Sequence, residues 1–197
     1  SPLAAILLAI ELLLFEFSAR SFIPVALACI TGAAGHHLLF EEGVVFPLSF
    51  QLQPSSNYAL LFYATMGIVI GLISVIVTKV VYWIEDVFEK LPIHWAWWPA
   101  IGGIAVGVIG FFAPRTLGVG YSNITDLLTG TMPMQVVLSL CILKFVSWAI
   151  SLGSGTSGGT LAPLLTIGGA TGALLGGIGI FWFPNSGINI PLSVLVG

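Results

Sequence analysis

Residues 134–183 read MQVVLSLCILKFVSWAISLGSGTSGGTLAPLLTIGGATGALLGGIGIFWF, and this stretch limits the classes of fold that the chain can adopt. Two apolar segments, Met134–Leu152 and Leu161–Phe183, lie on either side of a glycine-rich break. Each segment has close to the ~20 residues that a helix needs to cross the hydrocarbon core of a bilayer. The stretch therefore predicts two membrane-spanning helices joined by a short irregular connection.

The whole chain is as apolar as this stretch. Of its 197 residues, 57% are hydrophobic and 7% are charged, whereas soluble domains carry about 25% charged residues. The formal net charge is −3, with only five basic residues, so the chain lacks the basic surface of a nucleic-acid-binding protein. We expect a multi-pass integral protein of the cell membrane, in contact with the lipid bilayer and without a nucleic-acid partner.

Further apolar segments predict additional spans. Their unequal lengths and their glycine and proline interruptions favour an all-α, polytopic protein with tilted and discontinuous helices. Both ends of the sequence lie within apolar runs, so we expect residues 1–197 to be a single transmembrane domain fragment of a longer protein. The additional segments are Leu3–Leu14, Ser21–Phe40, Tyr58–Ile84, Trp97–Ala113 and Ile188–Val196.

Glycines recur every four positions in three of the predicted helices. This spacing places them on one helix face and lets a neighbouring backbone approach closely. We interpret these faces as packing surfaces, which carry no information about a ligand. They consist of Gly67 with Gly71, Gly103 with Gly107, and the run Gly168, Gly172 and Gly176.

The glycine-rich break, Gly153–Pro163 (GSGTSGGTLAP), has the composition of an anion-binding site. Irregular backbone at membrane depth is tolerated only where protein or a water-filled cavity surrounds it. Glycine lets backbone N–H groups approach a ligand closely. The helix that begins near Thr160 would present unpaired N–H groups at its positive end. Such groups bind an anion without a full positive charge, which permits its release during conduction.

The same residues fit two other interpretations. Gly153, Gly158 and Thr160 fit the spacing of a nucleotide-binding P-loop, but Gly159 occupies the position of its lysine, which disfavours phosphate binding. A flexible Gly/Ser turn is the simpler structural interpretation. No group of side chains has a recognisable catalytic context, so we expect neither an enzyme nor a cofactor, and we predict no metal site.

The motif Gly158-Gly159-Thr160-Leu161-Ala162-Pro163 resembles the G-G-x-F-x-P signature of the CLC family of chloride channels and chloride/proton antiporters. Pro2–Glu11 and Gly107–Gly120 also resemble family segments. The likeness covers essentially the whole chain, from the end of the first internal repeat to the start of the second. It implies that the protein moves chloride across a membrane and that backbone amides bind the anion. The residues implied are Gly158, Gly159, Thr160 and Leu161. Lys144 stands where family members carry Arg or Lys; positive potential near the pore, pairing with an acid and extension toward the membrane interface are equal interpretations of it.

The resemblance also bears on protons and on assembly. Many family antiporters carry a proton-admitting glutamate directly after the position matched by Glu11, where this chain has Leu12. Glu11 is the main candidate for a proton pathway, so a passive channel and a chloride/proton antiporter both stay open. Family members are homodimers, which implies dimer contacts through Ser21–His37 and part of Tyr58–Glu89.

Two functions of other classes fit the residues as well. A cation-coupled carrier could use the same connection to bind a small carboxylate solute. A structural membrane subunit would move no ion at all. The resemblance favours chloride as the ligand, but Leu161 stands where the signature has phenylalanine, so the apolar wall of the pore should differ from that of other members.

Overall fold

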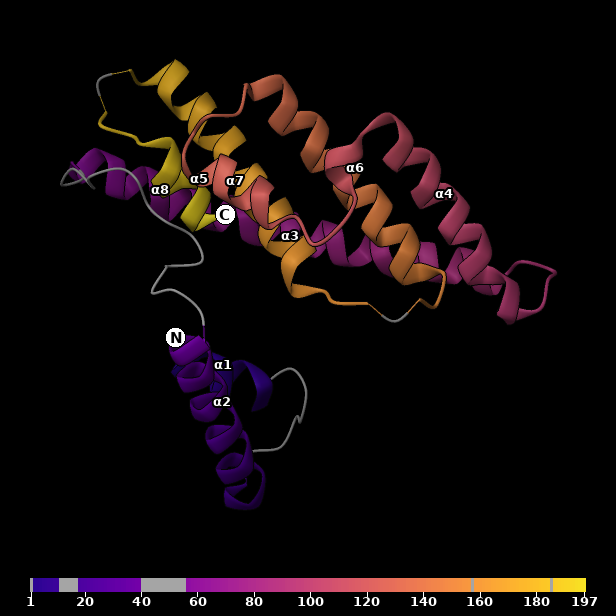
Figure 1. Cartoon of the computed structure of the whole chain (residues 1–197). Coiled ribbons are helices and arrows are strands. Elements are labelled where there is room, and N and C mark those ends of the chain that lie inside the picture. The colour runs from indigo at the N-terminus through magenta and orange to yellow at the C-terminus, as the bar shows by residue number, and fades with distance from the viewer. Residues whose placement is uncertain (1, 11–17, 40–55, 157, 185) are drawn as a thin grey trace. The chain divides into compact units, whose positions relative to one another are not determined.

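The computed structural model describes residues 2–10, 18–39, 56–156, 158–184 and 186–197. The chain divides into two compact units, Ser1–Pro47 and Leu48–Gly197, and each is described by itself. Every regular element in the described ranges is a helix (Figure 1). The predicted all-α class is therefore confirmed.

The first unit contains α1 (Pro2–Ala9) and α2 (Ala19–Leu39), which pack against each other. Most large apolar side chains of α2 are nevertheless exposed, as at Leu27 and Ile30. An exposed apolar surface on a 21-residue helix is suited to contact with lipid or with another apolar helix. Glu11, on which the predicted proton pathway depends, lies outside the described residues.

The second unit is built along α3 (Asn57–Glu89), a helix of 33 residues. At 1.5 Å per residue it extends ~50 Å, which exceeds the ~30 Å hydrocarbon core of a bilayer. Its first turn is capped by Ser56, whose Oγ accepts a hydrogen bond from the backbone N–H of Ala59 at 3.2 Å. The helix contacts α6 (Met134–Gly153), α7 (Leu161–Trp182) and α8 (Ile190–Val196), and it crosses behind them in Figure 1.

Prolines mark where several other helices begin. Pro99, Pro163 and Pro191 lie in the first turns of α4, α7 and α8, where a missing N–H leaves no helical hydrogen bond unmade. Pro114 stops α4, because the residue before a proline is pushed away from helical backbone angles. The elements are η2 (Trp95–Trp97), α4 (Trp98–Phe112), η3 (Pro114–Thr116), α5 (Tyr121–Leu128), α6 (Met134–Gly153), α7 (Leu161–Trp182) and α8 (Ile190–Val196).

Five helices within the described ranges are long and apolar enough to cross a membrane. The short helix α5, of eight residues, lies between two of them, and α8, of seven residues, follows the last; both are too short to span a bilayer. Spanning helices therefore alternate with breaks and short pieces, as predicted for a polytopic protein with discontinuous helices. The spans are Arg20–Leu39, Asn57–Glu89, Trp95–Phe112, Met134–Gly153 and Leu161–Trp182.

The glycine run on α7 forms the contact with α8. A Cβ on Gly172 would overlap the carbonyl group of Ser193, and one on Gly168 would overlap that of Gly197. The packing interpretation is confirmed for this run. The pairs on α3 and α4 differ, because a Cβ at Gly67, Gly71, Gly103 or Gly107 would meet no described atom within 4 Å.

Candidate functional site

The helix α6 ends in a Schellman motif that leads into the glycine-rich connection. Gly155 has a left-handed φ of 75°, and its N–H donates to the carbonyl oxygen of Leu152 at 3.1 Å. The N–H of Thr156 donates to the carbonyl oxygen of Ser151 at 3.4 Å. The Oγ of Ser154 donates to that same carbonyl oxygen at 2.7 Å. These bonds satisfy carbonyl groups at the negative end of α6.

The helix α7 begins without such a cap. Thr160 occupies the N-cap position and makes no side-chain cap hydrogen bond. The first N–H groups of a helix have no acceptor within the helix and carry a partial positive charge. The connection thus joins a satisfied negative helix end to an uncapped positive end. The partial positive charge that remains at the start of α7 suits an anionic ligand.

A cavity of about 220 Å³ lies beside this connection. Gly158 and Gly159, both predicted from the sequence, line it together with Lys144. The predicted residues Thr160 and Leu161 are not among its lining residues, and Leu161 is 47% exposed. The structure therefore brings three of the predicted site residues to one cavity and leaves two at its margin, where α7 begins.

Lys144 is 4% exposed although it lies within a membrane-spanning helix. Its Nζ donates hydrogen bonds to the carbonyl oxygen of Thr116 at 2.8 Å and to that of Gly118 at 2.9 Å. Pairing with backbone carbonyls is one of the ways in which a charged side chain is accommodated at membrane depth. The ammonium group is thus directed at the segment that follows α4.

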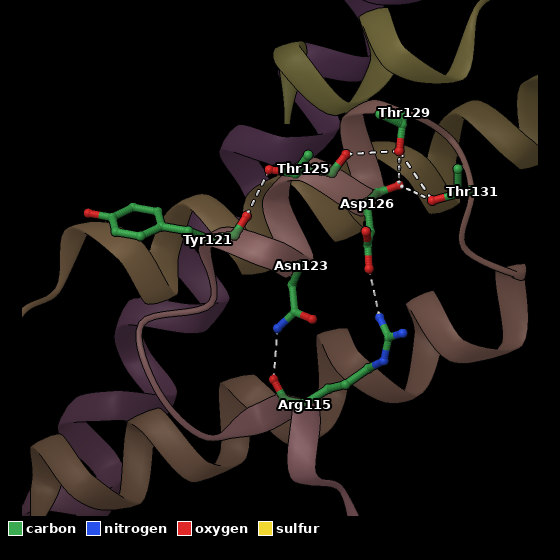
Figure 2. Close-up of polar contacts among 7 residues, drawn as sticks. All are labelled: Arg115, Tyr121, Asn123, Thr125, Asp126, Thr129 and Thr131. Atoms are coloured by element: carbon green, nitrogen blue, oxygen red, sulfur yellow. Dashed lines mark hydrogen bonds and ion pairs between the residues drawn. The ribbon is translucent and has the colours of Figure 1, made fainter. Parts of the chain in front are cut away.

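The segment after α4 is also held from α5, as Figure 2 shows. Asn123, which is 3% exposed, donates from Nδ2 to the carbonyl oxygen of Arg115 at 2.7 Å. The guanidinium of Arg115 pairs with the carboxylate of Asp126 at 3.0 Å, with both side chains partly exposed. Gly118 and Gly120 have φ values of 71° and 87°, which residues with a Cβ rarely adopt. Side chains from two helices therefore fix the path of residues 115–118.

Comparison with known proteins assigns the chain to a family. The family model of the voltage gated chloride channels matches residues 1–197. The chain belongs to this family. The resemblance inferred from Gly158–Pro163 and its flanking segments is thereby confirmed. Family membership and the five apolar helices together identify the chain as an integral membrane protein.

Curated CLC relatives match most of the chain. They include the "Voltage-gated ClC-type chloride channel ClcB" of Shigella boydii serotype 18 and that of Escherichia coli O17:K52:H18. Each is 28% identical over 188 residues, which cover 94% of this chain and 44% of the relative. The chain thus spans less than half the length of these CLC relatives.

The residues predicted from sequence for this CLC chain do not include the serines of α6 that line the cavity. Ser147 and Ser151 both line it, three and seven positions after Lys144. Ser147 is 5% exposed, and within the described ranges its hydroxyl makes no hydrogen bond. Residues at i, i+3 and i+7 share one face of a helix. This polar face, in an otherwise apolar segment, is the sequence signal that identifies them.

Proposed function

We propose that this chain forms one wall of a chloride pathway across a membrane, with the anion bound by backbone N–H groups between Gly158 and Leu161. The observation that carries the proposal is the cavity beside the uncapped start of α7, which Gly158 and Gly159 line. An unpaired ion in a low-dielectric interior costs on the order of tens of kcal/mol. Partial positive charges on preoriented N–H groups offset this cost. The printed names of the ClcB relatives support chloride as the anion.

Chloride efflux from liposomes tests the proposal against its alternatives. The full-length protein that contains this chain is reconstituted into vesicles loaded with potassium chloride, and external chloride is followed with an electrode. We expect selective chloride loss that does not depend on an added solute. Flux only in the presence of a small carboxylate would instead identify a carrier. No flux from folded, correctly inserted protein would identify a structural subunit.

The substitution Gly159→Val tests the site itself. A Cβ at Gly159 would meet no described atom within 4 Å, so an added side chain begins in open space beside the cavity. We expect weaker chloride binding, because the valine blocks access to the backbone N–H groups. Gly71→Val on α3 is the matched control, because its Cβ also meets nothing within 4 Å and Gly71 does not line the cavity. Unchanged chloride affinity in Gly159→Val would contradict the assignment.

Proton coupling is a second candidate property, and Glu11 is the residue we propose for it. An acidic side chain in a membrane segment is a candidate member of a proton pathway. Leu12, at the position matched to the family's proton-admitting glutamate, favours passive conduction instead. A pH gradient imposed across chloride-loaded vesicles separates the two. Uphill chloride movement that Glu11→Gln abolishes supports exchange, whereas a pH gradient that moves no chloride supports a channel.

We also propose that the full-length protein is a homodimer, with contacts from α2 and α3. The proposal is supported by large exposed apolar side chains on both helices, as at Leu27, Ile30, Leu72 and Ile76. The mass of the protein in detergent, measured by light scattering with the detergent contribution subtracted, tests it. A mass of one chain at concentrations that sustain transport would contradict it.

A further inference from the structure

Lys144 and the segment Thr116–Gly118 form one side of the cavity at which we propose that chloride binds. All of these residues line it. The Nζ of Lys144 lies 2.8 Å from the carbonyl oxygen of Thr116 and 2.9 Å from that of Gly118. An ammonium group has three donors, and these two bonds use two of them. The lysine therefore contacts the wall of the cavity through two backbone groups.

The two carbonyl groups present an electrostatic problem to an anion. Each carbonyl oxygen carries a partial negative charge and repels an anion that approaches it. The repulsion is larger in a low-dielectric interior than in water. A positive charge bonded to both oxygens offsets their field and fixes their direction. Without it, the same wall would attract water or a cation.

We propose that Lys144 is a positioning residue of the chloride pathway, which acts by binding the carbonyl groups of Thr116 and Gly118 and so keeps this wall of the cavity from repelling the anion. The inference rests on the proposed function, because its ligand is the chloride assigned there. It differs from the sequence prediction of a general positive potential, because it gives the ammonium two specific partners.

The segment has a second attachment that is independent of Lys144. Asn123 of α5 donates to the carbonyl oxygen of Arg115 at 2.7 Å, and the hydroxyl of Thr116 donates to the carbonyl oxygen of Ala113 at 2.7 Å. Neither bond involves Lys144. Lys144→Met should therefore free two carbonyl groups while the surrounding chain keeps its path.

The test compares Lys144→Met and Lys144→Arg in the full-length protein. Chloride efflux is measured in liposomes, and the ratio of chloride to potassium permeability is taken from reversal potentials in a potassium chloride gradient. We expect Lys144→Met to lower chloride flux roughly tenfold or more, as when buried polar groups lose their partner, and to lower the permeability ratio. Arginine, whose guanidinium can donate to both carbonyls, should retain most of the flux and the ratio.

Lys79→Met on α3 is the matched control. Lys79 also lies within a membrane-spanning helix but is exposed and does not line the cavity. Its replacement removes the same charge from the same kind of element and should leave flux and permeability ratio at wild-type values. Equal losses in both methionine variants would show a general charge effect and would overturn the proposal.

Other outcomes are equally decisive. Wild-type flux and permeability ratio in Lys144→Met would overturn the positioning role while leaving the proposed function intact. An absence of chloride flux in the wild-type protein would instead refute the proposed function. If Lys144→Met does not fold, Lys144→Gln replaces it, because its shorter uncharged amide cannot substitute for the ammonium at both carbonyls. A wild-type permeability ratio in that variant would overturn the inference.

Discussion

Gly102 of α4 lies against the side chain of Ser154, so closely that a Cβ on the glycine would overlap the serine hydroxyl. Ser154 is fully buried and directly follows α6. Its hydroxyl also lies 3.0 Å from that of Thr156, one of the residues that line the cavity. The packing of α4 on α6 is thus connected to the start of the glycine-rich connection.

Gly102→Ala is expected to destabilise the protein and to impair transport together. The added methyl group displaces Ser154, and overpacking of this kind costs roughly 1–3 kcal/mol. The displacement shifts the Schellman motif that leads to Gly158 and Gly159. Thermal unfolding in detergent and chloride efflux measure the two effects. Gly103→Ala is the control, because its Cβ meets no described atom within 4 Å; equal effects at both positions would contradict the explanation.

Ser147→Ala is expected to weaken chloride binding with little change in stability. The hydroxyl lines the cavity and, within the described ranges, makes no hydrogen bond that its removal would break. Loss of a hydrogen bond to a charged group such as an anion corresponds to about 1.5–3 kcal/mol, or roughly a tenfold to hundredfold change in affinity. Isothermal titration with chloride measures it. Ser139→Ala, on the same helix but outside the cavity, is the control; equal affinities in the two variants would remove Ser147 from the site.

Two polar contacts of α5 should differ in their contribution to stability. Asn123→Ala removes a buried amide and leaves the carbonyl group of Arg115 without this donor, at a cost of about 1–3 kcal/mol. Asp126→Asn breaks an ion pair between partly exposed side chains, which contributes roughly 1 kcal/mol or less after screening by solvent. Figure 2 shows both contacts. Unfolding temperatures should therefore rank Asn123→Ala below Asp126→Asn, and the reverse order would show that the exposed pair dominates.

The close approach of α7 and α8 should make Gly172 intolerant of any side chain. Gly172→Ala places a methyl group against the backbone of Ser193 and should lower the unfolding temperature markedly, because backbone cannot move aside as a flexible side chain can. Gly67→Ala on α3 meets nothing within 4 Å and should be neutral or slightly stabilising, as alanine favours helix. Similar unfolding temperatures for the two variants would contradict the packing role of the α7 glycines.

Much of this fold follows from the positions of the long apolar segments in the sequence. The predicted span Met134–Leu152 corresponds to α6, and Leu161–Phe183 to α7; both starts agree, and each C-terminal end differs by one residue. The predicted end of α3 at Ile84 was too early, because the helix continues to Glu89. Hydropathy falls at Glu85 and Asp86, yet both residues belong to the same continuous helix. Hydrophobic pattern locates the span, whereas hydrogen bonding and the following Pro92 set the helix end.

The site could be predicted only in part, for a physical reason. The sequence indicates Gly158 and Gly159 as candidates because their spacing before a helix is distinctive, and both residues line the cavity. The partners of Lys144 were not, because Thr116 and Gly118 contribute carbonyl groups, which every residue carries and no sequence pattern distinguishes. They also lie 28 and 26 positions away along the chain. Contacts of this kind depend on the path of the backbone after α4, which is set by left-handed glycines and by Asn123.

The Schellman motif at Gly155 has a consequence for how this protein family can diversify. The direction in which the chain leaves α6 is fixed by backbone bonds and by Ser154, before Gly158 and Gly159 are reached. None of these bonds involves positions 158–161, so substitutions there are expected to leave the end of α6 unchanged. If chloride binds where we propose, ion preference should respond to single substitutions at these positions, such as the leucine that stands at position 161 where the family signature has phenylalanine.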